Sequence, residues 1–513
     1  MIKHLRLIGL YFMLLLAAGC ATVDFDAPKP ESHVITETEN TYLAHQVRDQ
    51  VLLHPGQAGF YPVYNGVDSL ALRLLMAKRA EKTIDAQYFL IYDDLVGNLF
   101  VQSLLAAADR GVRVRFLLDD ILSQGLDPGL AKMNAHENIE VRIFNPFANR
   151  KFRALDAPTG LDRITRRMHN KSFTADNQVS LIGGRNIAAE YFDAKRNQKF
   201  ADLDVLTIGP IVNEVSSMFD TYWNHAAAVP ISQLTEAPKV ADNTLADYQA
   251  RVSASLEEAE NSEYADALQQ SLVDYIRSDS GKLTWADYDL VFDSPDKTQT
   301  RTAKDADSIV TQMGDRIGEV QKELFVATAY FVLDKEGLAA FRRARERGVE
   351  VTVLTNSLAS NNHTSAHSGY ASDRKKLLEM GVRLYEFKAL QSGRSDEKIA
   401  SDATISTLHA KAFVVDREKI FIGSFNWNQR SVNRDTELGV IIQSPEISSE
   451  LVDLVTPALS TSSYEVFLNE KGQLRWRIEE DGQEIVLDKE PQSGFWRRFS
   501  AGFMRILPIK SQL

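Results

Sequence analysis

A long internal repeat is the feature of the sequence that most restricts its fold. Residues 82–120 and 322–357 both read as a β-branched strand, a helix that stops at a glycine (Gly111, Gly348) and a second apolar strand. Short apolar strands that alternate with helices predict a buried, mostly parallel sheet flanked by helices. We therefore expect an α/β protein made of two similar units related by pseudo-twofold symmetry.

The repeat continues into a histidine motif, MHNKSFTAD in the first half and LHAKAFVVD in the second. His169 and His409 lie 240 residues apart, as do Asn186 and Asn426 (409 − 169 = 426 − 186 = 240). Side chains alternate along a strand, so each histidine and the lysine two residues later point to one face. Histidine can act as nucleophile or general acid/base, and lysine supplies positive charge for a phosphate.

A single histidine on an apolar strand is as easily a hydrogen-bonded core residue as a catalytic one. Two histidines that recur with lysine, aspartate and asparagine at identical offsets favour catalysis. Small residues at the following strand end would let the asparagine amides approach a phosphoryl oxygen. The candidate motif residues are His169, Lys171, Asp176, His409, Lys411 and Asp416, and the candidate phosphate ligands are Asn186, Asn426, Gly184 and Ser424.

H-x-K-x4-D followed by a Gly/Ser-rich turn and Asn resembles the signature of the phospholipase D superfamily, over roughly residues 60 to 460. Within it, the strings HNKSFTAD, LIGGRNI, LHAKAF and FIGSFN are most similar to the bacterial cardiolipin synthase C group. The resemblance implies one active site built from both repeats. It also implies phosphatidyl transfer between phospholipids without a metal or other cofactor, with hydrolysis by water as the alternative outcome.

In such enzymes one histidine forms a covalent phosphohistidine while the other protonates the leaving alcohol and later deprotonates the incoming hydroxyl. By this analogy His169 is the nucleophile and His409 the acid/base, although the residues alone leave the order open. Lys171, Lys411 and the two asparagines would bind the non-bridging oxygens. Asp176 and Asp416 are interpreted as structural braces.

Each catalytic imidazole needs a partner that fixes its tautomer. Glu437 lies 28 residues after His409 (437 − 409), where superfamily members often place a carboxylate, so we expect it to serve the histidine of its own repeat. In the first repeat, Asp202 is the candidate and Asp204 the alternative. Surface solvation is the competing interpretation of these acids.

The N-terminus has the pattern of an export signal. Lys3 and Arg6 precede an apolar run at residues 7–18, which is shorter than the roughly 18 residues that a membrane-spanning helix needs. Residues 16–20 (LAAGC) resemble a bacterial lipobox, although Ala17 stands where Leu is more usual. Cys20, the only cysteine, would carry the lipid and hold the protein on a bacterial membrane, facing the periplasm.

The C-terminal segment predicts a small antiparallel meander, with turns at Gly472 and Gly482, followed by an amphipathic helix. The helix either lies on the membrane surface near the mouth of the active site or packs against the body of the enzyme. Its apolar residues are Phe495, Trp496, Phe499, Phe503, Ile506 and Leu507, flanked by Arg497, Arg498, Arg505 and Lys510.

These patterns divide the chain into six segments. They are the signal peptide (1–19), a polar tether (20–45), the first repeat (46–225), a helical connector or insertion (226–305), the second repeat (306–460) and the C-terminal meander and helix (461–513).

The competing functions differ in substrate. The formal net charge of −12 and the export signal favour phospholipid and a membrane surface over nucleic acid, although an exported nuclease of the same superfamily stays the runner-up. Basic residues in RITRRMHNK suit either phosphate substrate. His363 and His367 have an i, i+4 spacing, but a Gly/Ser/Asn-rich loop favours substrate-facing or solvated roles over a metal site. Intact motifs in both halves argue against an inactive scaffold.

Overall fold

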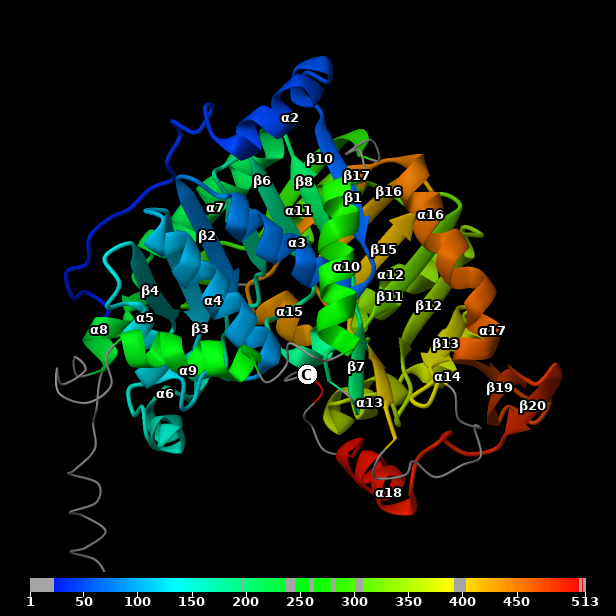
Figure 1. The fold of residues 1–513 in the computed structure, drawn as a ribbon. Coiled ribbons are helices and arrows are strands. Elements are labelled where there is room, and N and C mark those ends of the chain that lie inside the picture. Colours follow the sequence, from blue (N-terminus) through cyan, green and yellow to red (C-terminus); the bar gives the residue numbers. More distant parts are fainter. Residues whose placement is uncertain are drawn as a thin grey trace, which may run out of the picture.

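The computed structural model describes residues 23–195, 197–235, 245–257, 263–277, 283–299, 308–391, 403–506 and 510 of the 513-residue chain. The predicted signal peptide, Cys20 and Leu507 lie outside these residues. The described chain forms one 18-stranded sheet whose two halves correspond to the two repeats (Figure 1).

The first repeat contributes strands in the order β9–β4–β3–β2–β5–β6–β8–β1. The three strands β2, β3 and β4 pair in parallel, and the other pairs are antiparallel. The bounds are β1 Ala58–Val63, β2 Thr83–Tyr88, β3 Arg113–Asp119, β4 Ile139–Phe144, β5 Ser172–Ala175, β6 Val179–Gly183, β8 Asp204–Ile208 and β9 Ala228–Pro230.

The second repeat has the same order, β13–β12–β11–β15–β16–β17–β10, which confirms the predicted duplication. The meander β18–β19–β20 extends this half beyond β13. The bounds are β10 Thr284–Phe292, β11 Glu323–Thr328, β12 Glu350–Asn356, β13 Arg383–Phe387, β15 Lys411–Val415, β16 Lys419–Gly423, β17 Leu438–Gln443, β18 Ser463–Leu468, β19 Leu474–Glu480 and β20 Gln483–Leu487.

The α/β class is as expected, but the sheet is mixed. Parallel pairing is confined to β2–β3–β4 and β11–β12–β13, where helices connect the strands. The motif strands β5 and β15 instead continue into β6 and β16 through tight turns, which join antiparallel strands. Asp176 and Asp416 begin these turns in the left-handed region, with φ of 51° and 55°.

The two halves join at an antiparallel seam between β1 and β10, with Gly59 opposite Trp285. β10 also pairs with β17, as β1 pairs with β8, so it is the second repeat's counterpart of β1. The predicted connector 226–305 therefore contains two strands of the sheet, β9 at its start and β10 near its end. Its other described elements are the helices α8 (Ile231–Leu234), α9 (Leu245–Glu257) and α10 (Glu263–Arg277) and the 3-10 helix Pro295–Thr298.

The two β-α-β units arise from the same local signals. Asp94 caps α4 (Leu95–Asp109) by accepting from the N–H of Gly97 at 2.9 Å, and Asp334 caps α12 (Lys335–Glu346) through Gly337 at 2.7 Å. Both helices are followed by a glycine at positive φ, 91° at Gly111 and 88° at Gly348, which only glycine adopts without strain. The helices therefore end at the predicted glycines, and the aspartate caps fix where they begin.

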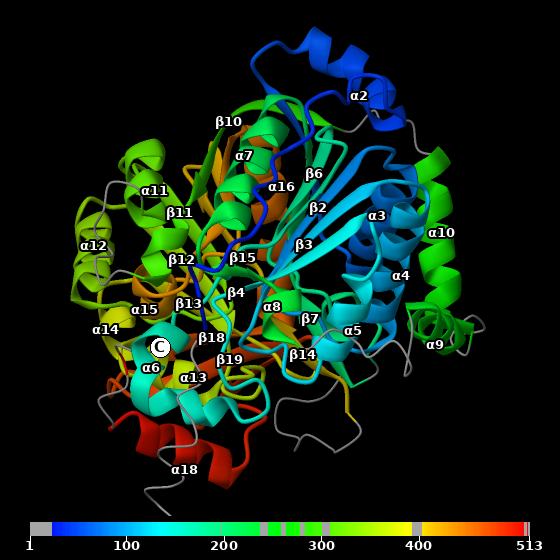
Figure 2. The ribbon, with the colours of Figure 1, turned by 90° about the vertical axis from the view of Figure 1, so that its left-hand side faces the viewer.

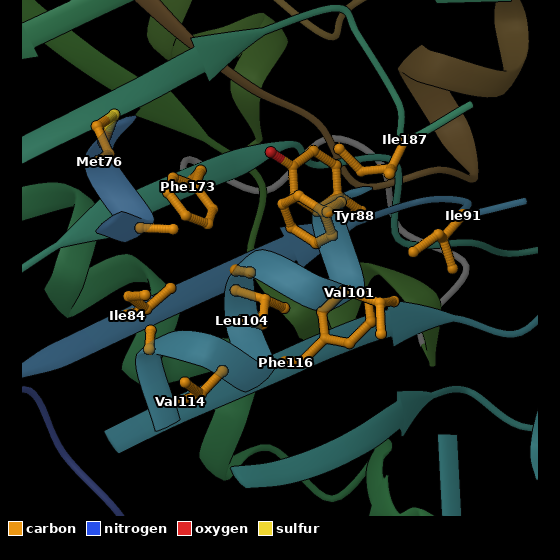
Figure 3. Packing of buried hydrophobic residues seen from close by; sticks show 14 of the residues in the cluster. Met76, Ile84, Tyr88, Ile91, Val101, Leu104, Val114, Phe116, Phe173 and Ile187 are labelled. Atoms are coloured by element: carbon orange, nitrogen blue, oxygen red, sulfur yellow. The ribbon is translucent and has the colours of Figure 1, made fainter. Parts of the chain in front are cut away.

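Helices α3 (Gly66–Arg79) and α4 cover one face of the first half, and α9 and α10 pack outside them (Figures 1 and 2). Figure 3 shows the core under α3 and α4, where Met76 and Leu104 meet strand residues such as Ile84 and Phe116. The second half has an equivalent core under α11 (Ile309–Ile317), α12 and α14 (Arg374–Glu379).

A third core lies between the repeats and makes them one body. Helix α7 (Pro210–Asn224) contributes Phe219 and Tyr222, and α16 (Pro445–Val455) contributes Ile447. Strand residues of both halves, such as Phe60 and Val414, pack in the same cluster. Burying this apolar surface fixes the relative position of the two motif strands.

The described part of the predicted tether, residues 23–45, packs on the first repeat. Lys29 donates to the carbonyl oxygens of Ala226 (3.2 Å) and Ala228 (2.9 Å), and the N–H of Val34 donates to Asp220 (2.8 Å). Helix α2 (Tyr42–Leu53) follows at the upper end of the molecule in Figures 1 and 2. None of the described helices is long and apolar enough to cross a bilayer.

Candidate active site

His169 lies three residues before β5 and His409 two residues before β15, so the histidines are not on the strands as expected, and the motif aspartate immediately follows each strand. Asp176 accepts hydrogen bonds from three successive backbone N–H groups at the start of β2, at 2.7–3.0 Å. Asp416 does the same at the start of β11, at 2.6–2.9 Å. These carboxylates pin one strand to the next at the end remote from the histidine, as expected of braces.

The backbone before each histidine is bound to the other repeat. The N–H of His169 donates to the carbonyl oxygen of Thr436 (2.9 Å), and the N–H of His409 donates to that of Ala201 (2.7 Å). Strand β14 (Ile405–Leu408), which leads to His409, pairs in parallel with β7 (Gln198–Ala201) of the first repeat. Both histidines therefore sit where the two repeats meet.

The carboxylates that bind the imidazoles are exchanged between the repeats. Nδ1 of His169 lies 2.9 Å from Oε2 of Glu437, and Nδ1 of His409 lies 2.6 Å from Oδ2 of Asp202. The expectation that each acid serves its own repeat is therefore wrong. The cause is the crossing of the backbone segments, because Glu437 and Asp202 directly follow the residues that bind the opposite histidine.

The alternative acid, Asp204, has a different role. It accepts from Ser69 (2.6 Å) and Arg73 (3.0 Å), and it pairs with Arg185 (3.4 Å). Asp202 is consequently the acid that contacts an imidazole.

Gly184 and Ser424, predicted to bind phosphate, instead support the exchanged carboxylates. Ser424 donates its hydroxyl hydrogen to Glu437, and Ser431 donates to the other oxygen at 2.6 Å. A side chain at Gly184 would place Cβ 2.2 Å from Oδ1 of Asp202. The small residues at this strand end are thus required by the carboxylates.

The two imidazoles are largely buried, with side-chain exposures of 12% for His169 and 7% for His409. Burial lowers the pKa of both, to about 3 in His409, where Lys411 adds to the effect and Asp202 opposes it. Burial opposes ionisation of Glu437, yet His169 holds the pKa of that carboxylate below its usual range. An ionised carboxylate accepts, so Nδ1 carries the proton and Nε2 presents a lone pair.

Lys171 and Lys411 place two buried ammonium groups beside the imidazoles. Nζ of Lys411 lies 3.0 Å from Nε2 of His409, and Nζ of Lys171 lies 5.2 Å from the centre of the Phe89 ring. Burial lowers the pKa of Lys411 to about 8 and that of Lys171 well below its ordinary value, against the pull of Glu437 and Asp202. Such cations are stabilised by a bound phosphate anion.

The predicted phosphate ligands Asn186 and Asn426 each bury a side-chain oxygen that has no hydrogen-bond partner in the described structure. The amide nitrogen of Asn186 donates to the hydroxyl of Tyr191 at 3.0 Å. Native proteins satisfy nearly all buried polar atoms, so the matching amide oxygens without a partner in both repeats indicate a place for a group that donates a hydrogen bond, such as a hydroxyl. A phosphate oxygen only accepts, so it would be bound through the amide nitrogens instead.

Aromatic side chains enclose the imidazoles, and sequence reasoning missed them. Phe89 meets His169 edge-on at 4.9 Å, while Tyr191 meets His409 edge-on at 4.9 Å and Phe200 stacks on it at 5.4 Å. The signal that could have found Tyr191 and Phe200 is their closeness in sequence to Asn186 and Asp202. These rings exclude water and hold the imidazole planes.

The i, i+4 histidines have separate surroundings. His363 lies against Tyr330, with ring centres 5.6 Å apart. His367 is buried, and its Nε2 lies 3.5 Å from a carboxylate oxygen of Glu490. The expectation that it is solvated or faces the substrate is therefore wrong. In the described part of the chain, no three His, Cys, Asp or Glu side chains are grouped to hold a metal ion.

Comparison with known proteins agrees with this geometry. A family model described as "Cardiolipin synthase, PLD-like domain" matches residues 74–223 and 313–455, one match in each repeat. The chain is 37% identical to cardiolipin synthase C of Escherichia coli (strain K12), over 89% of this chain and 96% of that protein. It is 28% identical to an uncharacterized protein of Helicobacter pylori (strain ATCC 700392 / 26695), over 96% of each.

The fold is similar to the crystal structure of phosphatidylserine synthase from Haemophilus influenzae Rd KW20. The two structures align over 84% of this chain and 92% of the synthase chain, with a TM-score of 0.54 at 13% sequence identity. The family model and the 37% identity extend over both repeats, each of which carries a complete motif. The chain therefore belongs to the cardiolipin synthase, PLD-like domain family of the phospholipase D superfamily.

Proposed function

We propose that this protein is a phosphatidyltransferase that joins two phospholipids into cardiolipin at one site shared by the repeats. The observation that carries the proposal is the pair of imidazoles whose Nδ1 atoms bind carboxylates of the opposite repeat. This arrangement occupies both Nδ1 atoms and leaves the Nε2 atoms for the reaction, with Nζ of Lys411 3.0 Å from Nε2 of His409, as a double displacement at phosphorus requires. The name of the relative from Escherichia coli supports cardiolipin as the product.

In the first step Nε2 of His169 attacks phosphorus and the bond from phosphorus to the headgroup oxygen breaks. His409, which the bound phosphate anion and Asp202 favour in its protonated form, gives that oxygen its Nε2 proton. In the second step the hydroxyl of an acceptor phospholipid attacks the phosphohistidine, His409 takes its proton, and the nitrogen–phosphorus bond breaks. Lys171 and Lys411 hold the non-bridging oxygens. Water in place of the acceptor would give hydrolysis to phosphatidic acid. His169 as nucleophile stays a prediction from the resemblance.

We propose further that Cys20 is lipidated and holds the protein on a bacterial membrane, facing the periplasm. The lipobox-like residues 16–20 and the absence of any other cysteine support this proposal. Cys20→Ser should then release the protein from membranes or leave it as precursor. A Cys20→Ser protein that fractionates and migrates as wild type would contradict it.

The test of function is conversion of phosphatidylglycerol to cardiolipin, followed by lipid mass spectrometry. His169→Ala and His409→Ala should each lower turnover at least about a thousandfold without unfolding the protein, because each group is indispensable to one half of the reaction. His136→Ala is the matched control, since His136 pairs with Asp109 at 3.1 Å away from the motifs. Near wild-type turnover by either motif variant would reject the shared site.

A further inference from the structure

Helix α18 (Phe495–Met504) turns its apolar side away from the protein. Only Ala501 of this helix is buried, whereas Phe495, Trp496, Phe499 and Phe503 are 57–76% exposed. Ile506, just after the helix, is 82% exposed. Of the two alternatives, packing of the stripe against the body of the enzyme is therefore contradicted.

The opposite side of α18 holds it in place. The hydroxyl of Ser368, in α13 (Thr364–Ala371), donates to the carbonyl oxygen of Ala501 at 2.9 Å, and Arg497 donates to the carbonyl oxygen of Asn361. Lys510 pairs with Asp373. An attached helix that displays four large apolar side chains, with Ile506 beside them, presents a patch that soluble monomers rarely leave uncovered.

A second apolar group projects from the first repeat. Phe152 precedes the 3-10 helix Arg153–Asp156, Leu155 lies within it, and Leu161 lies in the following helix α6 (Ala157–Ile164). The side chains are 71% exposed at Phe152, 58% at Leu155 and 60% at Leu161. Both views place α6 and α18 at the same, lower end of the molecule, opposite α2 (Figures 1 and 2).

Each apolar group is connected to the backbone that precedes one motif histidine. Residues 165–168 alone separate α6 from His169. On the other side, α18 rests on α13 and on the loop before it. In that loop the carbonyl oxygen of Ser360 accepts a hydrogen bond of 2.7 Å from the hydroxyl of Thr407, which lies two residues before His409. The two groups thus flank the site from its two halves.

We propose that these two groups form one docking face for a lipid bilayer, and the proposal rests on the function proposed above. Three observations favour a bilayer with anionic lipids as the occupant. Aromatic residues suit the membrane–water interface, and α18 contains no acidic residue and is followed by the exposed Arg505.

The third observation is the position of the N-terminal segment. The guanidinium of Arg163, in α6, lies 5.4 Å from the centre of the Phe25 ring. Phe25 lies five residues after Cys20, and a fully extended chain spans at most about 18 Å over that distance. A lipid on Cys20 would therefore hold the bilayer beside α6.

The direct test uses the full-length protein in vesicles of phosphatidylethanolamine and phosphatidylglycerol with brominated acyl chains, which quench tryptophan fluorescence on contact. We expect quenching that is largely lost in Trp496→Phe. If the quenched fraction is the same in wild type and Trp496→Phe, Trp496 does not contact lipid and the proposal fails. Cover of this face by a protein partner would give that same result.

The activity test compares two charge-introducing variants, Trp496→Glu/Phe499→Glu and Leu155→Glu/Leu161→Glu, with wild type. Each should lower turnover of vesicle phospholipid about tenfold or more, and leave the melting temperature and hydrolysis of soluble bis(p-nitrophenyl) phosphate unchanged. The matched control is Leu52→Glu/Leu53→Glu in α2, whose side chains are 71% exposed at the opposite end. Equal losses on both substrates, or an equal loss in the control, would overturn the docking face.

Failure of the proposed function gives a different pattern. Wild-type protein that converts neither phospholipid nor the soluble diester would reject the function, while quenching of Trp496 by brominated lipid would still establish the docking face.

Discussion

The two halves of the active site have the same motif but unlike surroundings. His169 contacts the longer Glu437, which is also bound by two serine hydroxyls, whereas His409 contacts the shorter Asp202, which lies against Gly184. Lys411 reaches the imidazole of His409, while Lys171 lies over Phe89. Duplicated sequence therefore supplies two imidazoles whose environments differ, as two roles in one reaction require.

The exchange of carboxylates gives the largest expected effect after loss of the histidines. Glu437→Gln and Asp202→Asn should each lower turnover about 10- to 100-fold, because an uncharged partner no longer fixes the imidazole tautomer or stabilises its protonated form. Initial rates on vesicle phospholipid measure this effect.

Double-mutant cycles on the free energy of unfolding then separate exchanged from within-repeat pairing. His169→Ala should couple with Glu437→Gln by about 0.5–3 kcal/mol, and with Asp202→Asn much more weakly. The reverse holds for His409→Ala. Stronger coupling within each repeat would refute the crossed arrangement.

Substitutions at Gly184 and Ser424, the small residues next to the two carboxylates, should have effects of intermediate size. Gly184→Ala should lower turnover more than Ser424→Ala, because the new Cβ would lie 2.2 Å from a carboxylate oxygen of Asp202. Overpacking typically costs about 1–3 kcal/mol, whereas loss of one hydrogen bond to Glu437 costs about 1 kcal/mol. Thermal unfolding and turnover of both variants check the order, and equal effects would contradict it.

The smallest expected effect is on the pH profile. Because the pKa of Lys411 is lowered to about 8, its charge is lost from the free enzyme as pH rises through that value, and kcat/KM should decline above pH 8. Lys411→Arg keeps the charge, so its lower activity should persist to higher pH. An alkaline limb that Lys411→Arg leaves in place would assign the decline to another group.

Local signals in the sequence predicted much of this molecule. The two motifs in register located His169 and His409, and the glycine stops located the ends of α4 and α12. Asp176 and Asp416 were interpreted correctly as braces because a short carboxylate beside a turn satisfies nearby backbone N–H groups.

The rest depends on contacts between distant segments. Glu437 binds a histidine 268 residues away, a pairing set by the β1–β10 seam and the core that α7 and α16 share. Strand β10 was not predicted, because it lies in the segment 226–305 that was interpreted as a helical connector. The polar composition of residues 20–45 predicted a tether, yet Lys29 binds carbonyl oxygens that follow α7.

The exchanged carboxylates also mean that duplication gave this protein no redundancy. A chain with two motif copies could in principle lose one and keep a spare. Here a lesion at Asp202 disables the imidazole supplied by the other copy, and a lesion at Glu437 does the same in reverse. Neither half contains a complete catalytic histidine with its carboxylate, so activity requires both repeats folded together.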